Sequence, residues 1–307
     1  MKLATTTGDF LAYSENIEQA LKFIHDCGFR YVDFDFSKAK VPEVFSDNWK
    51  DYAKRVKDAA DEFGMEFVQS HAPMGAPFAE NNSEFVADNI RCIKFCKELG
   101  INNTVVHCGY GGKMTKLDNF EKNKEFYSHL LPFAEECGVN ILTENFMQMH
   151  HESGTYWPDS AQELLEMIEY VNHPLFHACW DFGHANSTRV PPDESLRKLG
   201  KHVLAIHVHD NQGVEHPKYG YPDPHMAPLF GDVNWDSVMN GLLEIDYPGA
   251  FTLETSIVFG MAKYKKQYDK DTRINNARLP LDIKIQGEKL VHSIAKFILE
   301  SYDCYEG

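Results

Sequence analysis

The 307-residue chain contains no apolar run near the roughly 18 residues that a membrane-spanning helix needs. Its first residues, MKLATTTGDFLAYSENIEQ, lack the apolar stretch and cleavage site of a secretory signal. Positive charge is also scarce, because 30 Lys and Arg stand against 46 Asp and Glu and give a formal net charge of −16. A field of that sign repels polyanions, so nucleic acid is disfavoured as a partner. The sequence therefore predicts a cytoplasmic protein without membrane attachment.

Cysteine motifs and domain linkers are absent too. The seven cysteines show no zinc-ribbon or redox spacing, and Cys92 and Cys96 lie four residues apart, on one face of a predicted helix. We expect the cysteines to be reduced and to pack as small apolar side chains. No stretch rich in Pro, Gly or Ser separates two halves, so residues 1–307 are predicted to form one domain.

Short segments rich in β-branched and aromatic residues recur along the chain, and segments with helical spacing of apolar residues lie between them. Four of the helical segments end in a glycine directly before the next strand, at Gly28, Gly64, Gly100 and Gly138. A glycine there supplies the left-handed residue that ends a helix. Eight strands are predicted, in residues 2–7, 31–36, 66–71, 103–108, 140–145, 176–182, 203–210 and 250–255.

The alternation of strands and helices predicts a parallel sheet with right-handed crossovers, and eight such units predict closure into a (β/α)8 TIM barrel of the α/β class. A doubly wound open sheet is the alternative, but no GxGxxG turn follows the first strand. The longest irregular stretches, 145–160, 211–234 and 256–282, all follow strands. In a barrel they lie on the face that carries the active site.

Ligand-type side chains stand at the ends of six successive predicted strands. One such residue alone is usually structural and hydrogen-bonded, but the carboxyl ends of barrel strands ring a single mouth, so these side chains are expected to converge there. Imidazole and carboxylate together suit Zn²⁺, Mn²⁺ or Co²⁺ and contain too much nitrogen for a Ca²⁺ or Mg²⁺ cage. The residues are His71, His107, Glu144, Asp181 with His184, His207 with His209 and Asp210, and Glu254.

Five motifs in this order, LTEN, WDFGH, IHVHDN, DPH and TLET, resemble those of the xylose-isomerase-like TIM-barrel superfamily, which includes sugar phosphate isomerases/epimerases and AP endonuclease family 2. The resemblance implies that His184 contacts the substrate and that Glu144 and Glu254 flank a sugar as an acid/base pair. The chemistry agrees, because a metal acidifies the C–H beside a carbonyl and two opposed carboxylates can invert that carbon. It also implies that one divalent ion is held by Glu144, Asp181, His207 and Glu254.

The chain is also similar to endonuclease IV, a three-zinc nuclease of the superfamily, and every ligand position of that enzyme has a matching residue here. This similarity implies a centre of one to three ions, with zinc or manganese as the expected metal. The matching residues are His71, His107 and Glu144 for one ion, Glu144, Asp181, His207 and Glu254 for a second, and His184, Asp223 and His225 for a third.

The expected function is a metal-dependent isomerase or epimerase that moves a proton on the carbon next to a carbonyl of a small carbohydrate or polyol. Dehydratases of the inosose or dehydroshikimate type resemble the same barrel and begin with the same proton abstraction. A DNA nuclease is disfavoured by the net charge of −16 and by the HDN triplet at 209–211, which is closer to isomerase-like members. A binding protein without activity would be expected to lack ligands that this chain retains.

Other residues near the predicted mouth have expected roles. Trp157 follows the fifth strand and is a candidate to stack on a sugar ring, whereas strand alternation directs Trp180 outward against the helices. His209 is expected to contact the substrate or to support its neighbours. Asp210 is expected to orient a ligand histidine, because metal-bound imidazoles usually donate their other N–H to a carboxylate or carbonyl.

The segment 256–282 carries a local excess of positive charge. Its lysines and arginines, with Lys263 and Arg273 as representatives, are candidates to bind a phosphate or carboxylate of the substrate. A solvated loop or a contact between subunits is the alternative. Members of the superfamily commonly form dimers or tetramers, so a homo-oligomer is also expected.

Overall fold

The computed structural model describes residues 1–111, 114–147, 158–213, 223–255 and 279–307. Within them, eight parallel strands form one sheet in the order β7-β6-β5-β4-β3-β2-β1-β8. The two ends of this order meet, because Val208 pairs in parallel with Leu253 of β8 and its amide donates to Thr252 O at 2.8 Å. The predicted (β/α)8 barrel is therefore confirmed as a nearly closed, single-domain barrel. The strands are β1 (Leu3–Thr6), β2 (Tyr31–Asp35), β3 (Glu66–His71), β4 (Asn103–Val105), β5 (Asn140–Glu144), β6 (Phe176–Asp181), β7 (Val203–His207) and β8 (Phe251–Leu253).

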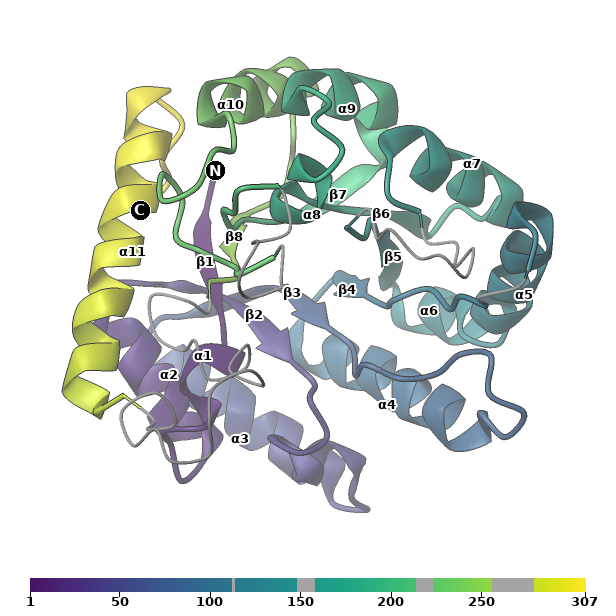
Figure 1. Cartoon of the computed structure of the whole chain (residues 1–307). Coiled ribbons are helices and arrows are strands. Elements are labelled where there is room, and N and C mark those ends of the chain that lie inside the picture. The colour runs from purple at the N-terminus through teal and green to yellow at the C-terminus, as the bar shows by residue number, and fades with distance from the viewer. Residues whose placement is uncertain (112–113, 148–157, 214–222, 256–278) are drawn as a thin grey trace, which may run out of the picture.

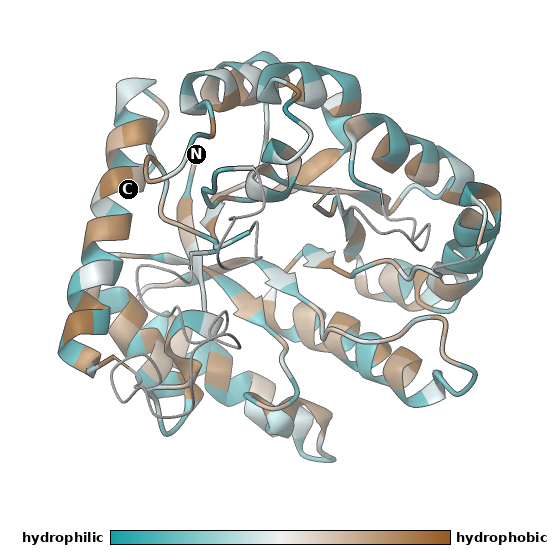
Figure 2. Cartoon of the chain, viewed as in Figure 1, coloured by the Kyte–Doolittle hydropathy of each residue, from teal (hydrophilic) through white to brown (hydrophobic). Residues whose placement is uncertain are grey.

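Helices surround the strands, with α11 along one side and α3 and α4 along another (Figure 1). Each of the longer helices carries both apolar and polar residues (Figure 2), as an amphipathic helix on a sheet requires. No helix in the described part of the chain is long and apolar enough to cross a membrane. The helices are α1 (Gly8–Leu11), α2 (Ile17–Asp26), η1 (Pro42–Phe45), α3 (Trp49–Glu62), α4 (Ser83–Leu99), α5 (Lys116–Ser128), α6 (Leu131–Cys137), α7 (Ala161–Val171), α8 (Phe182–Asn186), α9 (Pro192–Leu199), η2 (Gly200–His202), α10 (Trp235–Glu244) and α11 (Leu281–Ser301).

The glycines that follow four of the helices adopt the left-handed backbone that the sequence predicts. Their φ angles are 107° at Gly28, 62° at Gly64, 74° at Gly100 and 69° at Gly138. A side chain with a Cβ rarely takes these angles, so glycine ends each helix and turns the chain into the next strand.

The core has two parts, one on each face of the barrel sheet. The larger lies between the strands and the helices and includes Trp180, which is 1% exposed, so the outward direction expected for this side chain is confirmed. The smaller fills the barrel interior with Val105, Leu142, Cys179 and Ala205. All seven cysteines are free, as expected, and five of them are buried. Above the small interior cluster the barrel is lined by polar side chains, and these form the site.

Candidate metal centre

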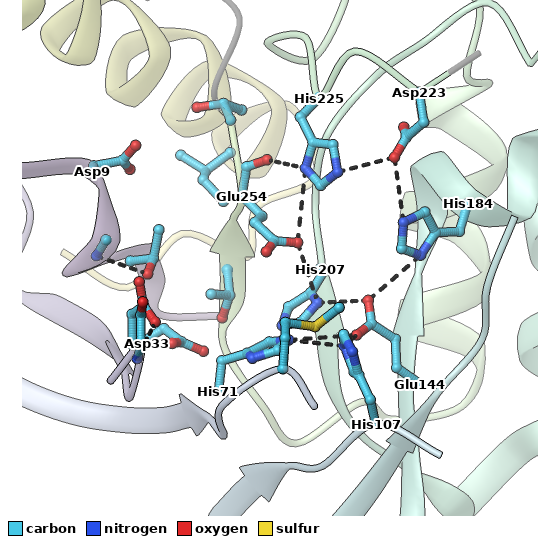
Figure 3. Close-up of a pocket in the computed structure, with 18 of the residues that line it drawn as sticks. Asp9, Asp33, His71, His107, Glu144, His184, His207, Asp223, His225 and Glu254 are labelled. Atoms are coloured by element: carbon cyan, nitrogen blue, oxygen red, sulfur yellow. Dashed lines mark hydrogen bonds and ion pairs between the residues drawn. The ribbon is translucent and has the colours of Figure 1, made fainter. Parts of the chain in front are cut away.

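The carboxyl ends of the strands bring the predicted ligand residues to one mouth of the barrel (Figure 3). Consecutive parallel strands end at the same edge, so residues far apart in the sequence become neighbours. The side chains that end a strand or lie within two residues of its end are His71 at β3, His107 at β4, Glu144 at β5, Asp181 at β6, His207 at β7 and Glu254 at β8.

Glu144 lies at the centre of this cluster. Its Oε2 is 2.7 Å from His107 Nε2 and 3.7 Å from His71 Nε2. Its Oε1 is 2.9 Å from His207 Nδ1 and 3.6 Å from His184 Nδ1. The carboxylate therefore joins two pairs of imidazoles, one pair on each oxygen.

The imidazoles keep this buried carboxylate ionised. Burial would raise the pKa of Glu144, but the charge of His207 and hydrogen bonds with His107, His207 and His71 lower that pKa well below its ordinary value. Burial would likewise lower the pKa of His71, but Glu144 raises it to about 9. For His107 burial prevails and its pKa is lowered, helped by the charge of His71. The cluster thus shares positive charge among several rings around one carboxylate.

Asp181 is held through its backbone and through its side chain. Its Oδ1 caps α8 by accepting a hydrogen bond from His184 N at 2.6 Å, and its Oδ2 is 3.0 Å from His209 Nε2. Asn145 accepts from Asp181 N at 2.7 Å and donates to Asp181 O at 3.0 Å. A Cβ at Gly183 would lie 1.9 Å from His209 Cε1. The WDFGH motif therefore needs its glycine because the imidazole of His209 occupies that space.

A second carboxylate, Asp223, lies near the imidazoles of His225 and His209 and near the other ring nitrogen of His184. Its Oδ2 is 2.9 Å from His225 Nε2 and 3.3 Å from His184 Nε2, and its Oδ1 is 3.5 Å from His209 Nδ1. The rings of His209 and His225 stack with centroids 3.8 Å apart. Burial would raise the pKa of Asp223, but the charges of His209 and His225 lower it well below its ordinary value. Asn211 fixes the carboxylate by donating to Oδ1 at 2.9 Å.

The geometry fits divalent ions. Each of three groups offers ligand atoms that all lie within 4.8 Å of one another. Imidazole nitrogen with carboxylate oxygen is the donor set of Zn²⁺ and Mn²⁺ sites. A cation between these carboxylates would also reduce the repulsion between their negative charges. The groups are His71, His107 and Glu144; Glu144, Asp181, His207 and Glu254; and His184, His209, Asp223 and His225.

A cavity of about 460 Å³ opens over these groups. Phe146 and Met74 give it apolar surface, while Glu144 and Glu254 are among its polar lining residues. Glu254 is the more accessible of the two, with 33% of its side chain exposed against 2% for Glu144. The volume is that of a pocket for a small molecule.

Residues 21–270, most of the chain, match the family model described as xylose isomerase-like TIM barrel. The chain belongs to the xylose isomerase-like TIM barrel family. The predicted membership of that superfamily is therefore confirmed.

Individual proteins resemble this xylose isomerase-like barrel in sequence or in structure. The uncharacterized protein MJ1311 of Methanocaldococcus jannaschii is 26% identical over 250 residues, which are 76% of this chain and 79% of that protein. D-psicose 3-epimerase from Clostridium cellulolyticum H10, solved with D-tagatose, has a TM-score of 0.73 at 15% identity and covers 97% of this chain and 99% of its own. The IolI protein with a bound zinc atom has a TM-score of 0.73 at 18% identity, over 98% of this chain and 99% of its own. At these identities the two structural likenesses show a shared fold.

In this xylose isomerase-like barrel, each residue that was matched to an endonuclease IV ligand belongs to at least one of the three groups. His209 joins the third group although no ligand position was matched to it. It is completely buried and is not among the residues that line the cavity, and its ring nitrogens face Asp181 and Asp223. Trp157, Lys263 and Arg273 lie outside the described residues.

The expectation that Asp210 orients a ligand histidine is wrong. Its Oδ1 accepts from the amides of Asn211 at 2.9 Å and Val233 at 3.1 Å, and its Oδ2 accepts from Trp235 Nε1 at 3.0 Å. Strand alternation explains the difference, because Asp210 points away from the side on which His207 and His209 lie. The carboxylate instead anchors the chain where α10 begins.

Two asparagines and one aspartate of the site were missed by reasoning from the sequence. Asn145 and Asn211 stand in the LTEN and HDN motifs, directly after ligand-type residues, and that position was the available signal. Asp33 of β2 lines the same cavity, on the side away from Asp223 (Figure 3). Its strand, YVDFDF, carries two aspartates in alternation, which marks an inward polar face.

Proposed function

We propose that the protein is a divalent-metal-dependent isomerase or epimerase that moves a proton on the carbon next to a carbonyl of a small sugar or sugar derivative. The observation that carries the proposal is the pair of carboxylates at one pocket. Glu144 Oε1 and Glu254 Oε2 lie 2.9 Å and 3.4 Å from His207 Nδ1, and both residues line the cavity. A substrate carbon held between them would meet a carboxylate on each side, so a proton removed on one face can return on the other.

The proposed ligands of the central ion, zinc or manganese, are Glu144, Asp181, His207 and Glu254. When bound, a divalent ion would polarise a carbonyl or hydroxyl oxygen and so acidify the neighbouring C–H. Up to two further ions are proposed for the groups around His71 and His107 and around His184, Asp223 and His225. The zinc atom in the structure of the IolI protein supports the choice of metal.

The two glutamates are proposed to act on opposite faces of the substrate carbon, with roles that follow from their exposure. Glu254 has a third of its side chain exposed and faces an incoming substrate, so it is the proposed first proton acceptor. Glu144 has its two oxygens 2.7 Å and 2.9 Å from imidazole nitrogens, and it is proposed to act on the opposite face. His184 lines the cavity with its Nε2 directed to Asp223. It is proposed either to bind a substrate oxygen or, with Asp223 and His225, to hold an additional ion.

The proposal is tested by proton NMR in D₂O. The zinc- or manganese-loaded protein is incubated with D-tagatose, D-psicose, D-fructose, a sugar acid and an inosose, and deuterium entry at carbon is followed. Deuterium entry with a new sugar signal is expected, and it should stop when a chelator removes the metal. Deuterium entry with loss of water would instead identify a dehydratase. If none of the compounds exchanges but an abasic-site DNA duplex is cleaved, the isomerase proposal is wrong.

A further inference from the structure

The wall of the cavity opposite the His184 and Asp223 side carries three aspartates. Asp9 follows β1 at the start of the chain, and Asp33 and Asp35 belong to β2. Figure 3 places Asp9 and Asp33 across the pocket from His184 and Asp223. Three carboxylates on one wall repel each other and any anion unless a cation or a hydrogen-bond donor compensates each.

Two of these three carboxylates are already paired with lysines. Asp9 accepts from Lys284 Nζ at 3.1 Å. Asp35 accepts from Lys40 Nζ at 2.8 Å and from the amide of Ser37 at 2.8 Å. Their charges are therefore balanced within the protein.

Asp33 differs from both. Its Oδ2 accepts from Gln69 Nε2 at 2.9 Å, and Gln69 is itself held by Thr252, which donates to Oε1 at 3.0 Å. Its Oδ1 is buried and has no hydrogen-bond partner among the described residues, and the residue is only 2% exposed. Buried carboxylate oxygens are costly to leave unpaired, so an unpaired one beside a pocket indicates that a donor arrives from outside the chain.

The direction of the side chain follows from the strand. Val32 and Phe34, its neighbours on β2, pack in the core between the sheet and the helices. Alternation along a strand then directs Asp33 to the barrel interior, and it lines the cavity there with His71 and Glu254. Gln69 and Thr252 hold it in one orientation, which a residue that positions a ligand requires.

We infer that Asp33 is a substrate-positioning residue whose Oδ1 accepts a hydrogen bond from a hydroxyl group of an uncharged, polyhydroxylated substrate. The inference rests on the proposed function and narrows its substrate class. A phosphate or carboxylate is disfavoured at this subsite, because an ionised Asp33 repels an anion and no lysine or arginine is paired with it among the described residues. Burial raises the pKa of Asp33 to about 6, with His207, His71 and Gln69 acting in the opposite direction, so the group is ionised and accepts hydrogen bonds above pH 7.

The test compares wild type with Asp33→Asn in calorimetric titrations of the zinc-loaded protein with D-tagatose, D-psicose, D-fructose and their single-deoxy analogues at pH 7.5. Asp33→Asn should weaken binding of the best ketose about 10-fold or more, because it replaces a charged acceptor with an amide. One deoxy analogue should bind wild type more weakly than the parent ketose by a similar factor. The same analogue should bind Asp33→Asn almost as well as the parent ketose does. Asp35→Asn is the matched control: its carboxylate is already satisfied, so discrimination against that analogue should persist. Zinc content and the thermal unfolding midpoint establish that each variant is folded.

The outcomes separate the inference from the proposed function. Equal ketose binding by wild type and Asp33→Asn overturns the inference, and deuterium exchange in D₂O then decides the proposed function independently. Ketose binding that depends on Asp33 without any deuterium exchange supports the inference and overturns the proposed function. Tighter binding of 1-amino-1-deoxyfructose than of D-fructose, lost in Asp33→Asn, overturns the uncharged class in favour of a cationic one. Failure of all ketoses to bind wild type overturns the inference, and deuterium exchange with the sugar acid and the inosose then decides the proposed function.

A crystal structure of the wild-type zinc complex with the best ketose gives a result that needs no variant. A sugar hydroxyl within hydrogen-bond distance of Asp33 Oδ1 is expected. A water molecule at that position, without sugar contact, would overturn the inference.

Discussion

Glu144 places one oxygen near each of two pairs of imidazoles, whereas Glu254 reaches the same group of residues with a third of its side chain exposed. We therefore predict different losses for the isosteric substitutions. Glu254→Gln should keep most of the bound metal but lower the exchange rate by about 10²- to 10⁴-fold, the usual contribution of a general acid or base. Glu144→Gln should lose metal as well as activity. Metal analysis of the purified variants, together with deuterium exchange, measures both effects, and wild-type exchange by Glu144→Gln would contradict its role.

Protons would compete with a bound metal ion for the same imidazoles. Burial would lower the pKa of His225, but Asp223 raises it to about 9, and the pKa of His71 is also about 9. A histidine must be neutral to bind a metal, so each such ligand releases a proton when the ion enters.

The sign of the pH dependence follows from these raised values. Between pH 6 and 9 the metal-free histidines hold protons that the ion must displace, so zinc affinity should rise with pH. The expected slope is about tenfold per pH unit for each proton released, and it should flatten above about pH 9. Competition with a chromophoric chelator at several pH values measures it. A constant affinity across this range would show that the histidines are already neutral.

At the scale of elements, helix α11 is joined to the first strand by buried ionic groups. Lys284 donates to Asp9 at 3.1 Å and to Glu288 at 2.9 Å, and Thr5 of β1 donates to Asp9 at 2.9 Å. Burial and the charge of Asp9 raise the pKa of Glu288 to about 7, although Lys284 acts to lower it. Since the pKa is raised on folding, the stability that this group contributes is fully present at pH 4 and is lost as the pH rises through 7.

Two substitutions in this network should therefore differ. Lys284→Met leaves Asp9 and Glu288 without their cation and should lower the free energy of unfolding by about 3–5 kcal/mol. Glu288→Gln should cost less than about 1 kcal/mol at pH 6, because the native carboxyl already holds a proton there. It should also reduce the fall in stability between pH 6 and 8. Urea unfolding at both pH values tests the pair, and equal losses from the two substitutions would argue against the network.

Element order was predictable because it depends on local signals. Alternating strands and helices fixed the barrel, and glycines such as Gly28 and Gly64 marked helix ends. The grouping of the candidate ligand residues followed from the same pattern, since strand ends converge in any parallel barrel. The sequence did not show which way a side chain points once the chain has passed the end of a strand. Asp210 was assigned to a histidine because it follows one, but its partner Trp235 lies 25 residues away and only the fold brings them together.

Asp33 is a second residue whose role could not be predicted from the sequence. Its type and strand position were visible in YVDFDF, but an unpaired oxygen is a property of three-dimensional neighbours. Only the structure brings Gln69 to one oxygen and leaves the other without a donor among the described residues. Candidate metal ligands are thus easier to predict, because residue type and strand position indicate them. A role that depends on a missing hydrogen-bond partner can be found only in the structure.

At the scale of the whole molecule, the barrel closes through few backbone hydrogen bonds between β7 and β8. Strands β4 and β8 have only three residues each, and β7 meets β8 through Val208 beyond the end of the strand. The candidate metal centre lies at this junction, because His207 and Glu254 flank it, and most of its proposed ligands come from the ends of six strands. An ion held there would tie together the strand ends that the backbone ladder joins most weakly.

We therefore predict that metal binding stabilises the entire barrel. Zinc at about 1,000 times its dissociation constant should raise the free energy of unfolding by about 4 kcal/mol, provided that the unfolded chain binds it weakly. Thermal unfolding followed by circular dichroism, with zinc and with chelator, measures the shift. The chelated protein should still fold, because the core between sheet and helices does not include the ligands. Glu144→Gln removes a ligand shared by two groups and should show a smaller shift. An unchanged midpoint in wild type would show that zinc does not prefer the folded protein to the unfolded chain, which would contradict the prediction.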